Sequence, residues 1–381
     1  MNLAANWSYP NPIRFGAGRI AEIADACKAA GISKPLLITD KGLADHPITS
    51  RTLSLLNEAG LGNALFAEVD PNPNDANVAD GVSVYREGGF DGVIAFGGGS
   101  GLDLAKTVAF MAGQTRPLWD FEDISDWWTR ADPNVIAPVV AVPTTAGTGS
   151  EVGRASVITK SDSHEKKIIF HPKMLPAQVI MDPELTVGMP KFITAGTGLD
   201  AFAHCVEAYS SPHYHPMSQG IALEGMRLVK EYLPRAYADG TDLEARGQMM
   251  SAAAMGATAF QKGLGAIHAL SHPIGAMHHT HHGTTNAVFM PAVLRFNSDA
   301  IRDRFDMAAA YLGIDGGFAG FCDFVDSFNA SFAIPKTLAQ LGVKDPDLCA
   351  LTEAALRDPS VGGNPIGLTE QNVRALFEAC L

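Results

Sequence analysis

The histidines of this chain are concentrated in one short stretch. Six of the twelve fall between His268 and His282. His268 and His272 are four residues apart, and the same spacing separates Asp200 from His204. In a helix, this spacing places two side chains on one face, one turn apart. Imidazole and carboxylate groups arranged in this way are suitable ligands for a divalent metal ion.

The spacing also restricts the path of the chain. In one straight helix, His268 and His282 would lie about 21 Å apart at ~1.5 Å rise per residue. Ligands of one ion must each come within about 2.1 Å of it, so the chain must turn back between them. Pro273 and Gly275 offer a place for that turn.

A single histidine of this kind is more often a core or capping residue, but the spaced set favours a metal site. Its members provide three nitrogen atoms and one oxygen atom, which suit both Fe(II) and Zn(II). The predicted ligands are Asp200, His204, His268 and His282.

Two glycine-rich segments each follow a short apolar run. Phe96–Gly101 reads FGGGSG and precedes a helical pattern, and Pro143–Glu151 reads PTTAGTGSE. Glycine lets the backbone approach a ligand closely, and the amides of a helix N-terminus attract phosphate. Either segment alone could be a tight turn without a ligand. Two such turns at one edge of a sheet predict a dinucleotide site.

Asp40 ends the apolar run that begins at Leu36. An acidic residue in this place can accept hydrogen bonds from ribose hydroxyls and repels a 2′-phosphate. We therefore expect NAD rather than NADP. Taken alone, Asp40 is better explained as a residue that caps a loop.

The elements that must position these residues alternate in the first half of the chain. Strands are expected at 36–39, 64–69, 93–96 and 139–142, and helices at 19–30, 48–59, 78–87 and 102–112. Such alternation predicts a mostly parallel sheet covered on both faces, which binds ligands at the carboxyl ends of its strands. Residues 114–134 interrupt the pattern as a polar excursion, expected to be a surface loop or subunit contact rather than a lid.

The pattern becomes helical and alanine-rich from Thr194 onward. We therefore expect an α/β dinucleotide-binding domain over residues 1–187 and an all-helical domain over residues 188–381 that holds the metal.

Composition excludes several other classes of protein. The formal net charge is −13 and there is no run of basic residues, so binding to nucleic acid or an anionic membrane is not expected. There is no pattern of a signal peptide and no apolar run of about 18 residues. The five scattered cysteines fit reduced thiols. Together these features predict a cytoplasmic protein.

The motifs together resemble those of the iron-containing (group III) alcohol dehydrogenase family. The segments that carry the resemblance are GGGSGLDLAK, PTTAGTGSEV, DPEL, GTGLDAFAHCVEAY and GLGAIHALSHPIGAMHHTHHGTTNAVFMPAVLRFN. They occur in the family's order and span nearly the whole chain. The resemblance implies a Rossmann-like N-terminal domain and a helical C-terminal domain, as in dehydroquinate synthase, with the active site in the cleft between them.

The resemblance also assigns individual residues. The family's metal ligands correspond to the four named above, with Fe(II) expected and Zn(II) as the alternative. His278, His279 and His281 form a histidine cluster richer than the family pattern requires, so one of them remains an alternative ligand. The cofactor contacts correspond to Asp40, Asn72, Gly98, Gly99, Ser100, Asp103, Thr144, Thr145, Thr148, Ser150 and Lys166.

The expected reaction is hydride transfer between NAD(H) and a small alcohol or aldehyde, or a hydroxy acid and its oxoacid. His272, on the same helical face as His268, is the expected acid–base residue, although it could merely pack or cap before Pro273. The alternatives are a lyase like dehydroquinate synthase, a maleylacetate reductase activity, or a metal-binding scaffold without activity. A homodimer is expected because dimers are common in the family.

Overall fold

The computed structural model describes residues 11–163 and 165–381. These residues form two compact units, one of residues 11–188 and the other of residues 189–381. The domain boundary expected from the sequence, between residues 187 and 188, lies one residue earlier in the chain.

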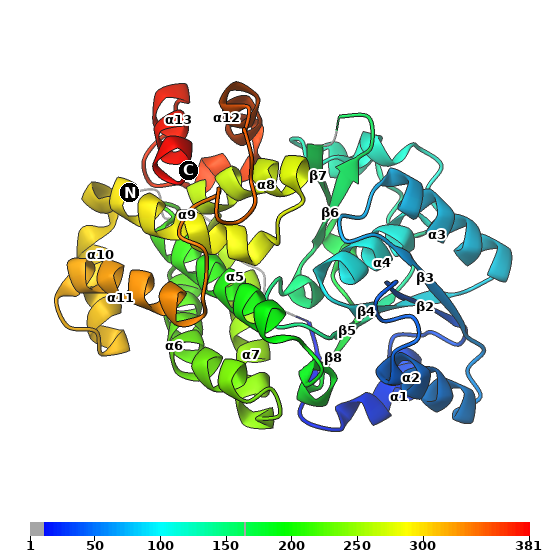
Figure 1. The fold of residues 1–381 in the computed structure, drawn as a ribbon. Coiled ribbons are helices and arrows are strands. Elements are labelled where there is room, and N and C mark those ends of the chain that lie inside the picture. The colour runs from blue at the N-terminus through cyan, green and yellow to red at the C-terminus, as the bar shows by residue number, and fades with distance from the viewer. Residues whose placement is uncertain (1–10, 164) are drawn as a thin grey trace. The chain divides into compact units, whose positions relative to one another are not determined.

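The first unit is built on a six-stranded sheet (Figure 1). Neighbouring strands are all parallel, in the order β1-β8-β5-β4-β2-β3. The carboxyl ends of β2, β4 and β5 therefore meet at one edge of the sheet. The strands are β1 (Ile13–Phe15), β2 (Pro35–Asp40), β3 (Ala64–Val69), β4 (Gly92–Gly97), β5 (Val139–Pro143) and β8 (Gln178–Met181).

Helices cover both faces of this sheet. The helices α1 (Ile23–Ala29) and α2 (Pro47–Glu58) lie on one face, and α3 (Asp75–Gly88) and α4 (Gly99–Met111) lie on the other (Figure 1). Alternate strand residues such as Leu37, Ile94 and Val140 are fully buried in the core that contains α1. Burial on both faces explains why the strands are continuous apolar runs, and the predicted α/β architecture is confirmed.

Four strands of this unit were not expected from the sequence. The edge strand β1 has only three residues and β8 only four, too short to show a period. Asp40 therefore ends the second strand rather than the first. The other two form a separate antiparallel hairpin of β6 (Ala155–Lys160) and β7 (Glu165–Phe170), whose sequence alternates only weakly between apolar and polar residues.

The excursion over residues 114–134 packs against its own unit. Two short 3-10 helices, η2 (Leu118–Phe121) and η3 (Trp127–Arg130), lie within it. The Phe121 ring is fully buried and meets Phe110 of α4 edge to face, with centroids 5.0 Å apart. Glu122 forms a β-bridge with Ile169 of β7. These contacts anchor the excursion between α4 and the hairpin.

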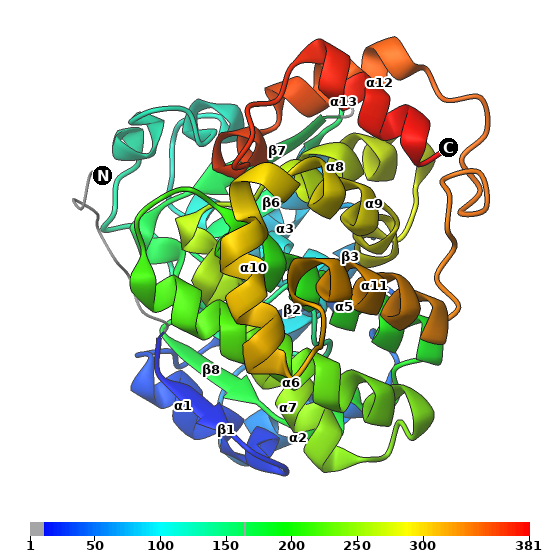
Figure 2. The ribbon, with the colours of Figure 1, turned by 90° about the vertical axis from the view of Figure 1, so that its left-hand side faces the viewer.

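The second unit consists of helices, as predicted, and its described residues form no strand. The nearly completely buried α5 packs against α6, α7 and α9, while α8 packs against α9 and α12 (Figure 2). The helices are α5 (Lys191–Ser210), α6 (Pro216–Ala238), α7 (Leu243–Ala259), α8 (Ala266–His278), α9 (His282–Phe296), α10 (Ser298–Leu312), α11 (Gly317–Ser331), α12 (Leu348–Arg357) and α13 (Glu370–Ala379).

The chain turns back between His268 and His282, but not at the expected residues. Pro273 and Gly275 both lie inside α8, which continues to His278. The turn is made by His279, in the left-handed conformation with φ 55°, and α9 begins at His282. A helix can continue past a proline when it loses only one backbone hydrogen bond, so a proline is a weaker stop signal than the prediction assumed.

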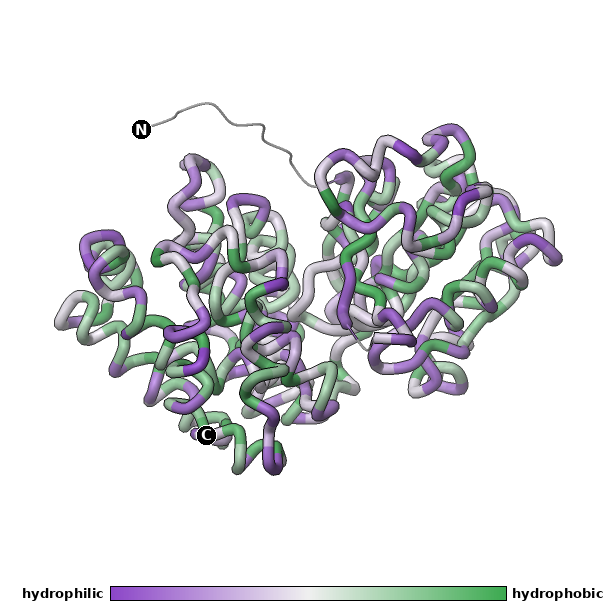
Figure 3. Tube along the Cα trace, turned by 90° about the horizontal axis from the view of Figure 1, so that it is seen from above, coloured by the Kyte–Doolittle hydropathy of each residue, from purple (hydrophilic) through white to green (hydrophobic). Residues whose placement is uncertain are grey.

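Hydrophobic and hydrophilic residues alternate along the helices of both units (Figure 3). Among the described residues, none of the helices combines the length and the apolar character that crossing a membrane would require.

Candidate functional site

The two glycine-rich turns lie directly against each other at the carboxyl ends of β4 and β5. The backbone N–H of Thr144 donates to the carbonyl oxygen of Gly97, at 2.9 Å. A Cβ atom on Gly98 would lie 3.2 Å from Thr145 Cγ2, and one on Gly99 would lie 2.6 Å from Thr148 Oγ1. The second distance is too short for carbon and oxygen, so the close approach of the turns requires glycine at position 99.

The first turn also opens a helix beside Asp40. The N-cap residue of α4 is Gly98, and no described side chain caps this helix end. Its amides are therefore suited to an anionic group of a ligand. Asp40 is partly exposed, and its Oδ2 lies 3.4 Å from the position that a Cβ on Gly97 would take. The structure thus brings the predicted ribose-binding carboxylate next to the predicted phosphate-binding turn.

Three further predicted cofactor residues come from segments that converge near the end of β3. Ser100 Oγ donates to the carbonyl oxygen of Pro71, at 2.5 Å, next to Asn72. The backbone N–H of Thr159 donates to Pro73, and Thr159 pairs with Lys166 in the hairpin. The hairpin therefore places the Lys166 backbone near the segment that contains Asn72.

Asp103 and Ser150 interact with each other rather than facing outward. Ser150 Oγ donates to Asp103 Oδ1 at 2.5 Å, and the backbone N–H of Val157 donates to Asp103 Oδ2 at 2.9 Å. Both residues are buried. These contacts connect α4 to the second turn and to the hairpin. Asp103 and Ser150 therefore stabilise the position of the second turn.

A buried lysine completes this support. Lys106, three residues after Asp103 on α4, donates through Nζ to the carbonyl oxygens of Ser150, Gly153 and Ala155. Burial lowers the pKa of Lys106, while Asp103 and Glu151 oppose that effect. Burial also disfavours the charged form of Glu151 and raises its pKa to about 7. Lys106 was not predicted as a functional residue, although its spacing from Asp103 was a signal for it.

In the second unit, the structure brings the predicted metal ligands together. Asp200 Oδ1 lies 3.7 Å from His204 Nε2, 3.7 Å from His268 Nε2 and 3.4 Å from His282 Nε2. Asp200, His204 and His268 are almost completely buried, whereas the His282 side chain is 29% exposed. The donor atoms of Asp200, His204 and His268 all lie within 4.8 Å of one another.

These separations fit a small divalent ion. Ligand atoms at about 2.1 Å from a tetrahedral ion are separated from one another by about 3.4 Å. The surrounding side chains also favour the ionised carboxylate, which is the form that binds metal. Although burial opposes ionisation, His204, His282 and His268 together hold the pKa of Asp200 well below its usual range.

Glu207 supports the site from behind His268. It lies on the same face of α5 as Asp200 and His204, and its Oε2 accepts a hydrogen bond from His268 Nδ1 at 2.5 Å. This contact leaves Nε2 as the ring atom that faces Asp200, which is the orientation that metal-binding histidines commonly have. Glu207 was not predicted, although its helical spacing from both ligands on α5 was a visible signal.

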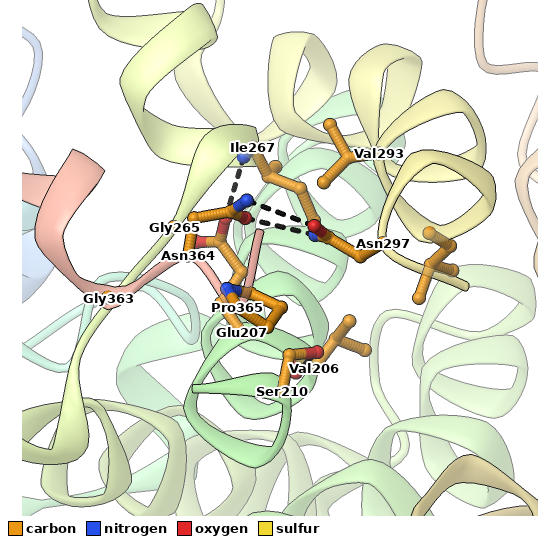
Figure 4. Close-up of a pocket in the computed structure, with 11 residues that line it drawn as sticks. Val206, Glu207, Ser210, Gly265, Ile267, Val293, Asn297, Gly363, Asn364 and Pro365 are labelled. Carbon is orange, nitrogen blue, oxygen red and sulfur yellow. Dashed lines mark hydrogen bonds between the residues drawn. The ribbon is translucent and has the colours of Figure 1, made fainter. Parts of the chain in front are cut away.

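The same carboxylate caps the start of α8 (Figure 4). Glu207 Oε1 accepts from the backbone N–H of Ile267 at 2.6 Å, and Asn364 Oδ1 accepts from that of Ala266 at 3.1 Å. Asn364 is held in turn by Asn297. These residues line a small cavity next to the helix end. The contacts fix the direction of α8 and thereby the position of His268.

His272 lies next to the ligand cluster. Its ring is stacked on that of His282, with centroids 5.3 Å apart, and lies 5.7 Å from the His268 ring. Its Nδ1 is hydrogen-bonded to Asp358 Oδ2 at 2.7 Å. Although burial opposes ionisation, His272 lowers the pKa of Asp358. Asp358, 86 positions away in the sequence, was not predicted because only the tertiary fold brings it to the histidine.

The remaining histidines lie at the turn between α8 and α9. His278 ends α8, His279 is exposed in the turn, and His281 is the N-cap of α9. The His281 ring accepts from the backbone N–H of Thr284 and packs against Gly196. The capping contact explains the presence of His281 without a metal ion.

The comparisons with known proteins cover nearly the whole chain. The model of the iron-containing alcohol dehydrogenases matches residues 10–183, and that of the C-terminal domain of the Fe-containing alcohol dehydrogenase family matches residues 194–381. A 4-hydroxybutyrate dehydrogenase of Cupriavidus necator is 39% identical over 97% of this chain and 98% of its own length. An NAD-dependent methanol dehydrogenase of Bacillus methanolicus is 34% identical over 99% of this chain and 100% of its own length.

A solved structure agrees with these relatives. The crystal structure of a 1,3-propanediol oxidoreductase superposes with a TM-score of 0.93 at 36% sequence identity, and the match covers 99% of both chains.

The contact between the two turns makes a prediction about Gly99. In Gly99→Ala the added Cβ forces Thr148 away, and overpacking of this kind costs about 1–3 kcal/mol. Because 1.4 kcal/mol corresponds to a tenfold change, we expect NADH to bind about 5- to 150-fold more weakly, as measured by its fluorescence. Gly62→Ala, whose Cβ would make only a 3.5 Å contact with Lys34, is the matched control. Unchanged NADH binding in Gly99→Ala would exclude this turn from the cofactor site.

Proposed function

This chain belongs to the iron-containing alcohol dehydrogenase family, and from that membership we propose that it transfers a hydride between NAD(H) and a small alcohol or aldehyde. The observation that carries the proposal is the convergence of Asp200 with three imidazole rings at separations that fit one divalent ion. The relatives are named as dehydrogenases, which favours hydride transfer over the lyase alternative.

Asp200, His204, His268 and His282 would hold the ion. A divalent metal bound there supplies Lewis acidity to the oxygen of the substrate. We propose Fe(II), because the family is named for iron, with Zn(II) as an alternative that the same donor atoms accept. Glu207 fixes the orientation of His268 and so keeps one nitrogen available for the ion. His282 is preferred over His281 because the His281 ring already caps α9.

The dinucleotide would be held by the two glycine-rich turns. The amides at the start of α4 would receive its phosphates, and Asp40 would accept hydrogen bonds from the adenosine ribose. Asn72, Thr144, Thr145, Thr148 and Lys166 are assigned as further contacts. Asp103 and Ser150 are assigned a supporting role, because their polar atoms are bonded to each other.

The relatives suggest the class of substrate. Their names refer to 4-hydroxybutyrate, methanol and 1,3-propanediol, all small molecules with a primary hydroxyl group. We therefore propose a short alcohol, diol or hydroxy acid as substrate, and the corresponding aldehyde as product.

His272 is proposed to move the proton that accompanies hydride transfer. Asp358 accepts from Nδ1–H, so the ring presents Nε2 as its basic atom. The ring lies next to the ligand cluster, and its hydrogen-bond partner Asp358 lies between α12 and η8 (Pro359–Gly363). A cytoplasmic location fits the five cysteines, which are all free, and a homodimer stays a prediction.

The first test is of activity and cofactor choice. After loading with Fe(II) or Zn(II), we expect the protein to reduce short aldehydes with NADH, and at least about tenfold less efficiently with NADPH. The reason is that Asp40 repels the 2′-phosphate, and a like-charge contact costs several kcal/mol. Asp40→Gly should narrow that preference. Equal kcat/KM values for both cofactors in the unmodified protein contradict the role of Asp40, and no turnover with any aldehyde contradicts the function.

The second test concerns the metal ligands. His282→Ala should lower metal affinity more than about 100-fold, because even the loss of an outer partner costs about 10–100-fold. NADH binding should remain, since the cofactor turns belong to the other unit. Metal analysis after dialysis measures the first effect and fluorescence the second. Full metal occupancy in His282→Ala would identify His278, His279 or His281 as the ligand instead, and His281→Ala is the matched variant to compare.

The third test concerns His272. Because acid–base assistance is typically worth about 10²–10⁴-fold, His272→Ala should lose turnover to that extent while keeping its metal. Asp358→Asn should cause a smaller loss in the same direction, because an amide can donate to Nδ1 and reverse the tautomer. The pH profile of kcat should change shape in both variants. Near-normal rates across pH in His272→Ala would show that this residue is structural.

A further inference from the structure

Asn286 lies among the proposed metal ligands. It follows His282 by one turn of α9 and is fully buried. Its side-chain nitrogen Nδ2 is 2.8 Å from Asp200 Oδ1, 3.2 Å from His268 Nε2 and 3.2 Å from His282 Nε2. A single amide group is therefore within hydrogen-bonding distance of three of the four ligand atoms.

The nitrogen end of the amide faces the ligands. Nδ2 is within hydrogen-bonding distance of all three ligand atoms, and an amide nitrogen can only donate. The opposite end, Oδ1, is buried and has no hydrogen-bond partner among the described residues. A buried carbonyl oxygen without a partner costs about 1–3 kcal/mol, so its retention calls for an explanation.

The contacts of Nδ2 and the bonds to a metal ion exclude each other. A metal ion is bound by neutral imidazole, and in that form the lone pairs of Asp200, His268 and His282 that face Nδ2 are the same lone pairs that would bind the cation. An N–H group that points toward a cation is also repelled by it. When the ion binds, the amide must therefore turn, and a turn of the amide plane brings the unpartnered Oδ1 to face the positive charge.

We propose that Asn286 is part of the metal centre and works in two orientations. Without the ion, its amide N–H groups hold the ligand atoms together, and with the ion bound, its carbonyl oxygen faces the metal. This inference rests on the proposed function, since it assumes that the four ligands bind a divalent ion. Asn286 is a positioning residue in the first orientation and contacts the metal centre in the second.

The test compares variants of the full-length protein by zinc titration and thermal unfolding, without reference to activity. Asn286→Ala removes both orientations, whereas Asn286→Asp keeps an oxygen that can face the ion but removes the N–H donor. Asn329→Ala is the matched control. Asn329 is also buried, also donates from Nδ2 (to the carbonyl oxygen of Ala287, at 2.8 Å), and also has an Oδ1 without a partner among the described residues.

We expect Asn286→Ala to raise the dissociation constant for Zn(II) by about 10–100-fold, the loss typical of residues that support metal ligands. Asn286→Asp should bind Zn(II) at least as tightly as the unmodified protein. After chelator treatment, however, its Tm should fall furthest, because two carboxylates then face each other. Asn329→Ala should lower the Tm and leave zinc affinity unchanged.

Other results would overturn the inference. Zinc affinity in Asn286→Ala equal to or above that of the unmodified protein would show that the amide only competes with the ion. If Asn286→Ala does not fold, the Asn286→Asp variant provides the test. Its cobalt(II) absorption spectrum should differ from that of the unmodified protein. An identical spectrum would contradict a contact between this residue and the ion. Failure of the unmodified protein to bind zinc, cobalt or iron would instead contradict the proposed function, and the inference with it.

Discussion

A buried carboxylate can remain ionised only if other groups compensate its charge, and Asp200 imposes this requirement on the second unit. The residue is 3% exposed, and water therefore contributes little to its stabilisation. The partners that replace water are the rings of His204, His268 and His282 and the amide of Asn286. They come from α5, α8 and α9, so these three helices must be held in one arrangement for the carboxylate to be tolerated at all.

Glu207 both stabilises the fold and orients a proposed metal ligand. One of its oxygens caps the N-terminus of α8, and the other orients the His268 ring. A carboxylate at a helix N-terminus is favourable in itself, because it faces the positive end of the helix dipole. The first unit has a comparable arrangement, in which Asp103 and Lys106 on α4 form hydrogen bonds with Ser150 of the second glycine-rich turn. In both units, a charged residue on a central helix positions the segment that would contact a ligand.

The parts of the fold and of the site that could be predicted from the sequence are those with a local period. The strands of the sheet and the helix pairs that carry Asp200, His204, His268 and His272 follow from spacing within a few turns. Glu207 was accessible to the same reasoning, since it extends the face of α5 that carries Asp200 and His204. The hydrogen bond between Asp358 and His272 could not be predicted in this way, because it joins residues far apart in sequence. Strands β1 and β8 are too short to show a period, and the turn at His279 lacks the glycine that usually marks a left-handed residue.

X-ray absorption spectroscopy at the metal edge of the loaded protein tests the central claim most directly. We expect one ion per chain, with a first shell of nitrogen and oxygen at about 2.0–2.2 Å and the outer-shell scattering of imidazole rings. A shell of sulfur at about 2.3 Å, or a spectrum without imidazole scattering, would contradict the assignment of Asp200 and the three histidines as the metal centre.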